Sequence, residues 1–489
     1  MNLPSAVAAV LLGALAGLHR AGGAPVPAAQ EGNPGPSIGP GNVEKLAKLV
    51  RSYYAFLDQE ALGKAKKDLD KLVDETGKIS KSLKLADPLL ALEDWREIVR
   101  RGLALDKPTV NLSWRVDLRL ATLAEDQTPR FQGSADAKEL QGVFDNRLKA
   151  FVSLPVDHLK VAYPIVVGLH PADGEVRALK DMKKSKQLVD EIEKWAKATY
   201  SKELLAKAIV IVPVMDLALR SADGVSFTRP RWDSDEGATW GFRALSQIIF
   251  PNVNHDARRI FLDGHGSAAQ AALLFCAQFP GLQTGCVVRG PPPQRIDFVN
   301  CVGTPILFIG RETQSFYEEW RGKEGFVLDL PVERVNDQDQ IKESLDDATF
   351  LQWMTDHPKE YAPRKLTLQT DRIEFASSYW LKVTDEDRTL DKLPIVVDAA
   401  VDRARNQISV VTNARVKGFE IYLNDELVDL SKEVRVVHRR SGGESESPEV
   451  ERFKGVLKRV VEDTLVWAYK RPYCNTGDVY VACIPVELD

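Results

Sequence analysis

Between residues 163 and 310 the chain alternates continuously apolar segments with helical ones, and no other feature constrains its fold as strongly. The apolar segments read YPIVVGL, AIVIVPV, RRIFLDG, GCVVRG and TPILFIG, and segments with helical patterns at 186–200, 236–249 and 268–279 separate the first four. Continuously apolar strands are typical of a parallel sheet covered on both faces. Strands and helices that alternate at short spacing predict a doubly wound α/β domain, which we assign to residues 112–363.

The segments on either side of this domain have different patterns. Residues 30–111 begin with a Gly/Pro-rich linker and continue as helices, because EKLAKLVRSYYAFL has apolar residues at i, i+3, i+4 and i+7 spacing. Residues 364–489 read as successive strands joined by turns. The fold class we predict is therefore α/β, with an N-terminal helical segment and a C-terminal β-rich module, a small sandwich.

The N-terminus predicts export. Residues 6–18 form an apolar run that is shorter than the ~20 residues of a membrane-spanning helix, and small residues follow it. We interpret residues 1–29 as a signal peptide and expect a periplasmic, cell-envelope or extracellular protein. This segment lacks the Lys or Arg usual before the apolar run, so a disordered apolar tail is the alternative.

Charge and motifs exclude several classes of function. The formal net charge is -5 and no basic stripe is present, so nucleic acid is not an expected partner. No later segment is long and apolar enough to predict an integral membrane domain. We expect no cofactor and no metal, because the sequence lacks a Walker A motif, a dinucleotide fingerprint, H-E-x-x-H and C-x-x-C. Of the five cysteines, Cys474 and Cys483 are a plausible hairpin disulfide.

Three segments of the α/β domain follow one another in a distinctive order: FVSLPVDHLKVAYPIVVGLHPADGE, RRIFLDGHGSAAQAALLFCAQFPGLQTGCVVRG and TPILFIGRET. Taken in this order, they resemble the α/β-hydrolase family, in particular its secreted esterase and depolymerase-like members. The resemblance implies a nucleophile elbow at DGHGSAA, which is a tight strand-to-helix turn with the catalytic serine at its apex. It also implies an acid after the TPILFIG strand and a histidine later in the chain.

The elbow has no serine in the expected frame. The turn requires small residues two positions before and two positions after the nucleophile. Gly266 satisfies this requirement with Gly264 and Ala268, whereas Ser267 would place the bulky His265 two positions before it. Gly266 therefore occupies the predicted apex and has no side chain that could attack a substrate. Ser267 is left as a displaced nucleophile or as a helix-capping residue.

The other two positions of the triad have weak candidates. Glu312 follows the TPILFIG strand and is either the acid or a solvated loop residue. The segment FVLDLPVERV is predicted to be the last strand, and the loop at 336–340 after it contains no histidine. His357, after the next predicted helix, is then the remaining candidate for the base. We interpret His170, His265 and Gly266 as residues that line the ligand site.

The residues favour a catalytically impaired hydrolase whose cleft still binds a small-molecule or polymer ligand. A first alternative is an active esterase or peptidase-like serine hydrolase that uses Ser267, Glu312 and His357. A second is a structural cell-envelope protein that assembles through its β-module. A fold alone does not decide among the three, because function is a property of the site.

Overall fold

The structure is a computed structural model of the 489-residue chain. It describes residues 38–58, 61–84, 92–103, 115–119, 147–156, 161–171, 185–213, 219–220, 227–228, 255–290, 298–323, 325–335, 338–360, 362–430, 432–441, 449–453 and 482–488. The predicted signal peptide at 1–29, the predicted helix at 236–249 and Cys474 lie outside these residues. The export prediction and the Cys474–Cys483 pairing therefore stay predictions.

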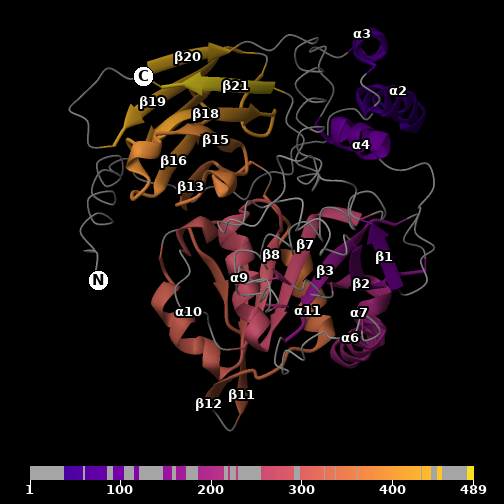
Figure 1. The fold of residues 1–489 in the computed structure, drawn as a ribbon, viewed down its shortest axis with the longest axis vertical. Helices are drawn as coiled ribbons and strands as arrows, with labels where there is room; N and C mark the ends of the chain where they lie inside the picture. The colour runs from indigo at the N-terminus through magenta and orange to yellow at the C-terminus, as the bar shows by residue number, and fades with distance from the viewer. Residues whose placement is uncertain are drawn as a thin grey trace.

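The central element is an eight-stranded sheet with the order β1-β2-β4-β3-β7-β8-β9-β10. Six neighbouring strands, from β4 to β10 in that order, are parallel, while β1 and β2 are antiparallel to their neighbours. Figure 1 shows the sheet in the lower half of the molecule. The strands are β1 (Arg115–Arg119), β2 (Arg147–Ser153), β3 (Tyr163–Leu169), β4 (Ile209–Pro213), β7 (His255–His265), β8 (Gly285–Arg289), β9 (Pro305–Ile309) and β10 (Val327–Asp329).

Helices cover both faces of this sheet. Successive residues of a strand point to opposite faces, and Ile165 and Val166 of β3 accordingly belong to two different apolar clusters. On one face pack α9 (Ala269–Gln278) and α10 (Gln314–Trp320). On the other pack α6 (Ser185–Thr199), α7 (Lys202–Lys207) and α11 (Asp347–Asp356). The expected mixed α/β architecture, with helices on both faces of the sheet, is confirmed.

The segment predicted as one final strand is divided by Pro331. Val327–Asp329 forms β10 at the edge of the sheet, while β11 (Val332–Val335) pairs in antiparallel fashion with β12 (Gln338–Ile341). A proline has no N–H for a strand ladder, which suits a break at this position. Within the 336–340 segment, expected to be the loop that holds the catalytic base, residues 338–340 belong to β12, whose pair with β11 projects from the domain (Figure 1). A second short hairpin joins β5 (Leu219–Arg220) to β6 (Phe227–Thr228).

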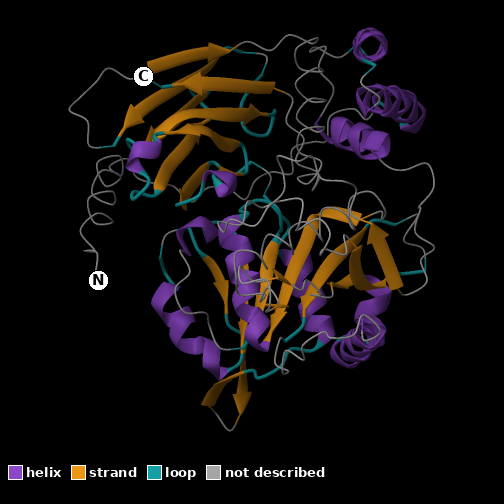
Figure 2. Ribbon diagram, viewed as in Figure 1, coloured by secondary structure: helices purple, strands orange, loops and turns teal. Residues whose placement is uncertain are grey.

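The C-terminal part is β-rich, as expected, and contains two sheets (Figure 2). Buried residues of both sheets belong to one apolar cluster. The first sheet has the order β13 (Lys365–Thr370), β16 (Ile395–Asp402), β17 (Gln407–Thr412), β19 (Val434–Arg440) and β20 (Glu449–Phe453). The second has the order β14 (Ser377–Ser378), β15 (Leu381–Glu386), β18 (Val416–Leu423) and β21 (Ala482–Glu487). We call these two sheets the β-module.

In the described part of the chain, three helices precede the α/β domain. They are α2 (Pro40–Asp58), α3 (Leu62–Ser82) and α4 (Leu92–Leu103), and α2 packs against the other two. Their buried residues, among them Leu46 and Trp95, belong to the same apolar cluster as the core of the β-module. None of the described helices combines the length and the apolar character that a membrane crossing would require.

The β-module contacts the α/β domain where α9 ends. The Asn300 amide donates to the Ala277 and Gln369 carbonyls at 2.8 and 2.7 Å, and the Gln369 N–H donates to Asn300 Oδ1 at 2.6 Å. The Phe279 and Phe375 rings lie 5.2 Å apart in an edge-to-face arrangement. Because α9 starts at the carboxyl end of β7 and runs back along the sheet, this interface lies at the amino ends of the parallel strands.

Candidate functional site

The predicted elbow is a tight turn between β7 and α9. Strand β7 ends at His265, a 3₁₀ turn spans Gly266–Ala268, and α9 begins at Ala269. Gly266 has a φ of +54°. This is the left-handed region of backbone conformation, which residues other than glycine adopt only at a cost of ~1–2 kcal/mol. The strained apex of the turn is thus a residue with no side chain.

Close backbone packing accounts for the small residues of the turn. A Cβ atom at Gly264 would lie 2.7 Å from the Ala268 carbonyl oxygen and 2.8 Å from the Ala269 Cα. Gly290, which follows β8, is equally restricted, because a Cβ there would lie 2.8 Å from the Gly266 carbonyl oxygen. The spacing that selected Gly266 over Ser267 in the sequence therefore has a steric basis in the fold.

Ser267 is the middle residue of the 3₁₀ turn and is half-buried. The apex conformation belongs to Gly266, one residue earlier. Ser267 does not occupy the cap position of either element, since His265 precedes the 3₁₀ turn and Ala268 precedes α9. Its role as a displaced nucleophile stays a prediction.

Glu312 lies at the same end of the parallel strands as the elbow. It is an exposed residue of the 3₁₀ turn Arg311–Thr313, directly after β9. In the sheet register, Ile309 of β9 pairs with Arg289 of β8, and Arg289 pairs with His265 of β7. Glu312 is therefore at the carboxyl ends of the parallel strands, two strands from the elbow.

His357 lies toward the opposite end of the parallel strands, the amino end. It follows α11, and the N–H of Lys359 donates to the Arg258 carbonyl at 2.8 Å. Arg258 lies near the start of β7, eight residues before Gly266. The His357 ring contacts the Trp353 carbonyl through Nδ1 at 2.9 Å and Asp329 through Nε2 at 3.5 Å. The structure does not bring Ser267, Glu312 and His357 together.

The two predicted ligand-site histidines contact one aromatic pair. The His265 and Trp195 rings lie 5.1 Å apart and the His170 and Trp195 rings 6.2 Å apart, both edge to face. Tyr200 contacts Trp195 and His265 at ring distances of 6.0 and 6.2 Å. Burial lowers the pKa of His170, which a hydrogen bond to the Pro171 carbonyl partly opposes. Burial raises the pKa of Tyr200, and the Asp263 carboxylate raises it further.

A buried carboxylate is the most prominent charged group of this edge, and our sequence reasoning did not select it. The Asp263 side chain is fully buried; its Oδ1 accepts from Arg289 Nε at 2.7 Å and its Oδ2 contacts His265 Nε2 at 3.1 Å. Burial raises the pKa of this carboxyl group, but the positive charge of Arg289 and the contact with His265 outweigh it, so the pKa lies well below its usual range. The signal was in the sequence, since IFLDG places an acid inside an apolar strand.

Comparison with known proteins leaves the family open. No protein-family model and no curated protein matches the sequence. Among solved structures, a thermostable esterase is 18% identical over 33% of this chain, with a TM-score of 0.24, and the match spans 42% of the esterase. An S-formylglutathione hydrolase from Agrobacterium tumefaciens is 13% identical over 43% of this chain and 90% of its own, with a TM-score of 0.29.

A third similar structure is a CE15 glucuronoyl esterase from Teredinibacter turnerae. It is 13% identical over 43% of this chain and 69% of its own, with a TM-score of 0.28. At TM-scores this low, the similarities support no conclusion about chemistry.

Proposed function

We propose that this is an exported protein of α/β-hydrolase-like fold that binds a ligand at the carboxyl ends of its parallel strands and forms no acyl-enzyme. The observation that carries the proposal is the conformation of Gly266. The turn presents its strained apex where a serine hydrolase presents its nucleophile, and the residue there has no side chain. The surroundings of His357 support the same reading, because its described contacts are with Trp353 and Asp329 and not with the turn, so a serine there would also lack that base.

The experiment is labelling with a fluorophosphonate probe, which reacts with activated serines. The purified protein is expected to remain unlabelled, as judged by mass spectrometry of its peptides. Gly266→Ser is expected to remain unlabelled as well, because restoring the hydroxyl does not bring His357 to this edge. Label on Ser267 of the wild-type protein would overturn the proposal in favour of the displaced nucleophile.

Export is a separate part of the proposal and has its own test. Expression of the full chain with its first 29 residues, followed by fractionation and N-terminal sequencing, is expected to give a shortened protein outside the cytoplasm. Retention of an intact N-terminus in the cytoplasmic fraction would contradict it.

A further inference from the structure

The two ring nitrogens of His265 have different surroundings. Its Nε2 contacts the Asp263 carboxylate. Because a carboxylate only accepts hydrogen bonds, Nε2 carries the proton and Nδ1 has the lone pair in the neutral ring. Nδ1 has no hydrogen-bond partner among the described residues, and the side chain is 17% exposed.

Asp263 holds this ring in one tautomer and one orientation. The carboxylate is fully buried and fixed on its other oxygen by Arg289, so it does not rotate away from His265. Trp195 packs edge to face against the same ring at 5.1 Å. A carboxylate that orients a histidine and stabilises its protonated form is the arrangement found behind general bases.

Two glycines and one cation lie beside His265 at the ends of β7 and β8. Gly266 and Gly290, the residues that follow His265 and Arg289, carry no side chains, and their backbones pack against each other. The Arg289 guanidinium, 18% exposed and one strand away, makes no hydrogen bond to the described residues beyond that to Asp263. Its positive charge attracts the negative charge that develops on a carbonyl oxygen under attack.

We propose that His265, positioned by Asp263, is a general base that activates water for direct hydrolysis of carboxylic esters. His265 Nδ1 takes a proton from water while the water oxygen forms a bond to the ester carbonyl carbon. Collapse of the tetrahedral species breaks the bond to the alcohol oxygen, which receives the proton from His265. The products are a carboxylic acid and an alcohol, and no bond to the protein forms. The inference rests on the proposed function, since an acyl-enzyme at Ser267 would bypass this step.

The test is steady-state hydrolysis of p-nitrophenyl acetate by the full-length protein. Wild type is expected to release p-nitrophenol above the buffer rate with no initial burst. His265→Gln keeps an N–H donor for Asp263 but removes the lone pair of Nδ1, and it is expected to lower the enzyme-dependent rate by about 100-fold, within the range of general-base contributions. His438→Gln, in the β-module, is the matched control and is expected to hydrolyse at the wild-type rate.

The pH dependence separates a base from a structural residue. The wild-type rate is expected to show a plateau that does not depend on pH, whereas the His265→Gln rate is expected to rise only in proportion to hydroxide. A His265→Gln variant with wild-type rate and pH profile, or a wild type with no rate above buffer, would overturn the inference. So would loss of activity in His357→Gln with His265→Gln unaffected. None of these outcomes involves fluorophosphonate labelling, so the inference can fail while the proposed function stands.

Discussion

Gly264, at the scale of single residues, shows how tightly the elbow is built. Its missing side chain lets the strand and the helix after it cross, with the Ala269 Cα only 2.8 Å from the position of a Cβ. Contacts this short are with backbone atoms, so the turn cannot relieve them by moving one flexible side chain.

Gly264→Ala is therefore expected to lower the free energy of unfolding by about 2 kcal/mol, the usual cost of overpacking. Urea unfolding followed by circular dichroism measures it. Gly63→Ala is the matched control: Gly63 lies within α3, and a Cβ added there would have no neighbouring atom within 4 Å, so the same change is expected to raise stability by about 0.5–1 kcal/mol. Equal losses in both variants would contradict this account.

The residue scale also marks the limit of what the sequence allowed. The frame of small residues was sufficient to identify Gly266 as the apex, because that requirement is local. The sequence did not reveal the partners of Asp263, and it did not reveal that His357 lies away from the elbow. Arg289 reaches Asp263 only through the pairing of β7 with β8, and His357 was placed by chain order, which carries no information on the edge of a sheet.

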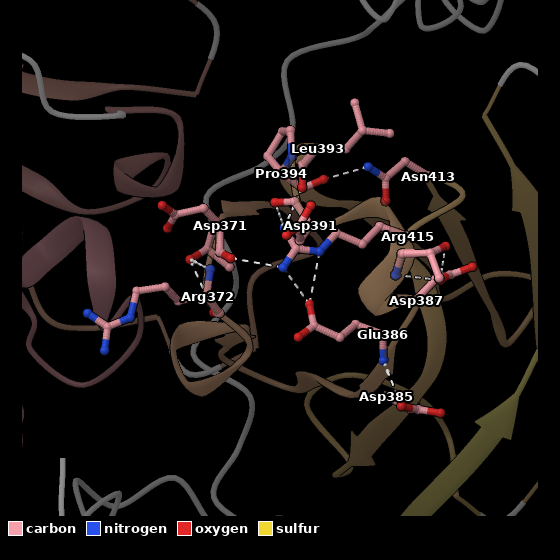
Figure 3. Close-up of polar contacts among 12 residues, drawn as sticks. Asp371, Arg372, Asp385, Glu386, Asp387, Asp391, Leu393, Pro394, Asn413 and Arg415 are labelled. Atoms are coloured by element: carbon pink, nitrogen blue, oxygen red, sulfur yellow. Dashed lines mark hydrogen bonds and ion pairs between the residues drawn. The ribbon is translucent and has the colours of Figure 1, made fainter. Parts of the chain in front are cut away.

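At the scale of elements, Arg415 fixes the loops of the β-module (Figure 3). Its guanidinium donates to the Glu386 carboxylate at 2.9 and 2.6 Å and to backbone carbonyls of Asp371, Asp391 and Leu393. The side chains of Arg415 and Glu386 are 5% and 12% exposed. One side chain thus joins the segments before β14, after β15 and before β16.

Arg415→Met is expected to destabilise the β-module by about 3 kcal/mol, because it leaves the Glu386 carboxylate buried without its partner. Thermal unfolding followed by calorimetry measures the loss. Arg405→Met is the control, because Arg405 is 77% exposed and forms a long ion pair of 3.5 Å with Asp402. The loss of this side chain is expected to cost less than about 0.5 kcal/mol. An Arg415→Met protein as stable as wild type would rule out this role.

Elements were predicted best where periodicity was strong and unbroken. The continuously apolar strands β3, β4, β8 and β9 were found because full burial leaves little ambiguity. The prediction of a single strand at 326–335 was wrong. The apolar pattern continues across Pro331, but the hydrogen bonding of the strand does not. Asp346 caps α11, with its side chain accepting from the Thr349 N–H at 2.8 Å.

At the scale of the whole molecule, the β-module lies at the amino ends of the parallel strands, remote from the elbow. Asn300 connects the two parts through two hydrogen bonds to the Gln369 backbone, and it is 6% exposed. The module therefore does not cover the carboxyl ends of the strands, where the ligand site is proposed.

Asn300→Ala is expected to weaken this connection by about 2 kcal/mol, because it leaves the backbone groups of Gln369 without their partner from the α/β domain. Calorimetry is expected to resolve two transitions in the variant where wild type shows one. Asn413→Ala removes contacts with the Pro394 carbonyl and the Val396 N–H inside the β-module, so it is expected to lower stability without separating the transitions. If Asn300→Ala and Asn413→Ala gave the same calorimetric trace, Asn300 would not be a distinct connection between the β-module and the α/β domain.

The last described strand has a consequence for biosynthesis. β21 pairs with β18, whose residues stand 59 to 69 positions earlier, and Ile484, Val486 and Leu488 are buried in the cluster that also contains Leu46 and Trp95. That cluster cannot be completed until β21 has left the ribosome. The helices α2–α4, synthesised long before β21, must therefore wait with part of their apolar surface uncovered, in the way that makes large proteins depend on chaperones while they are being made.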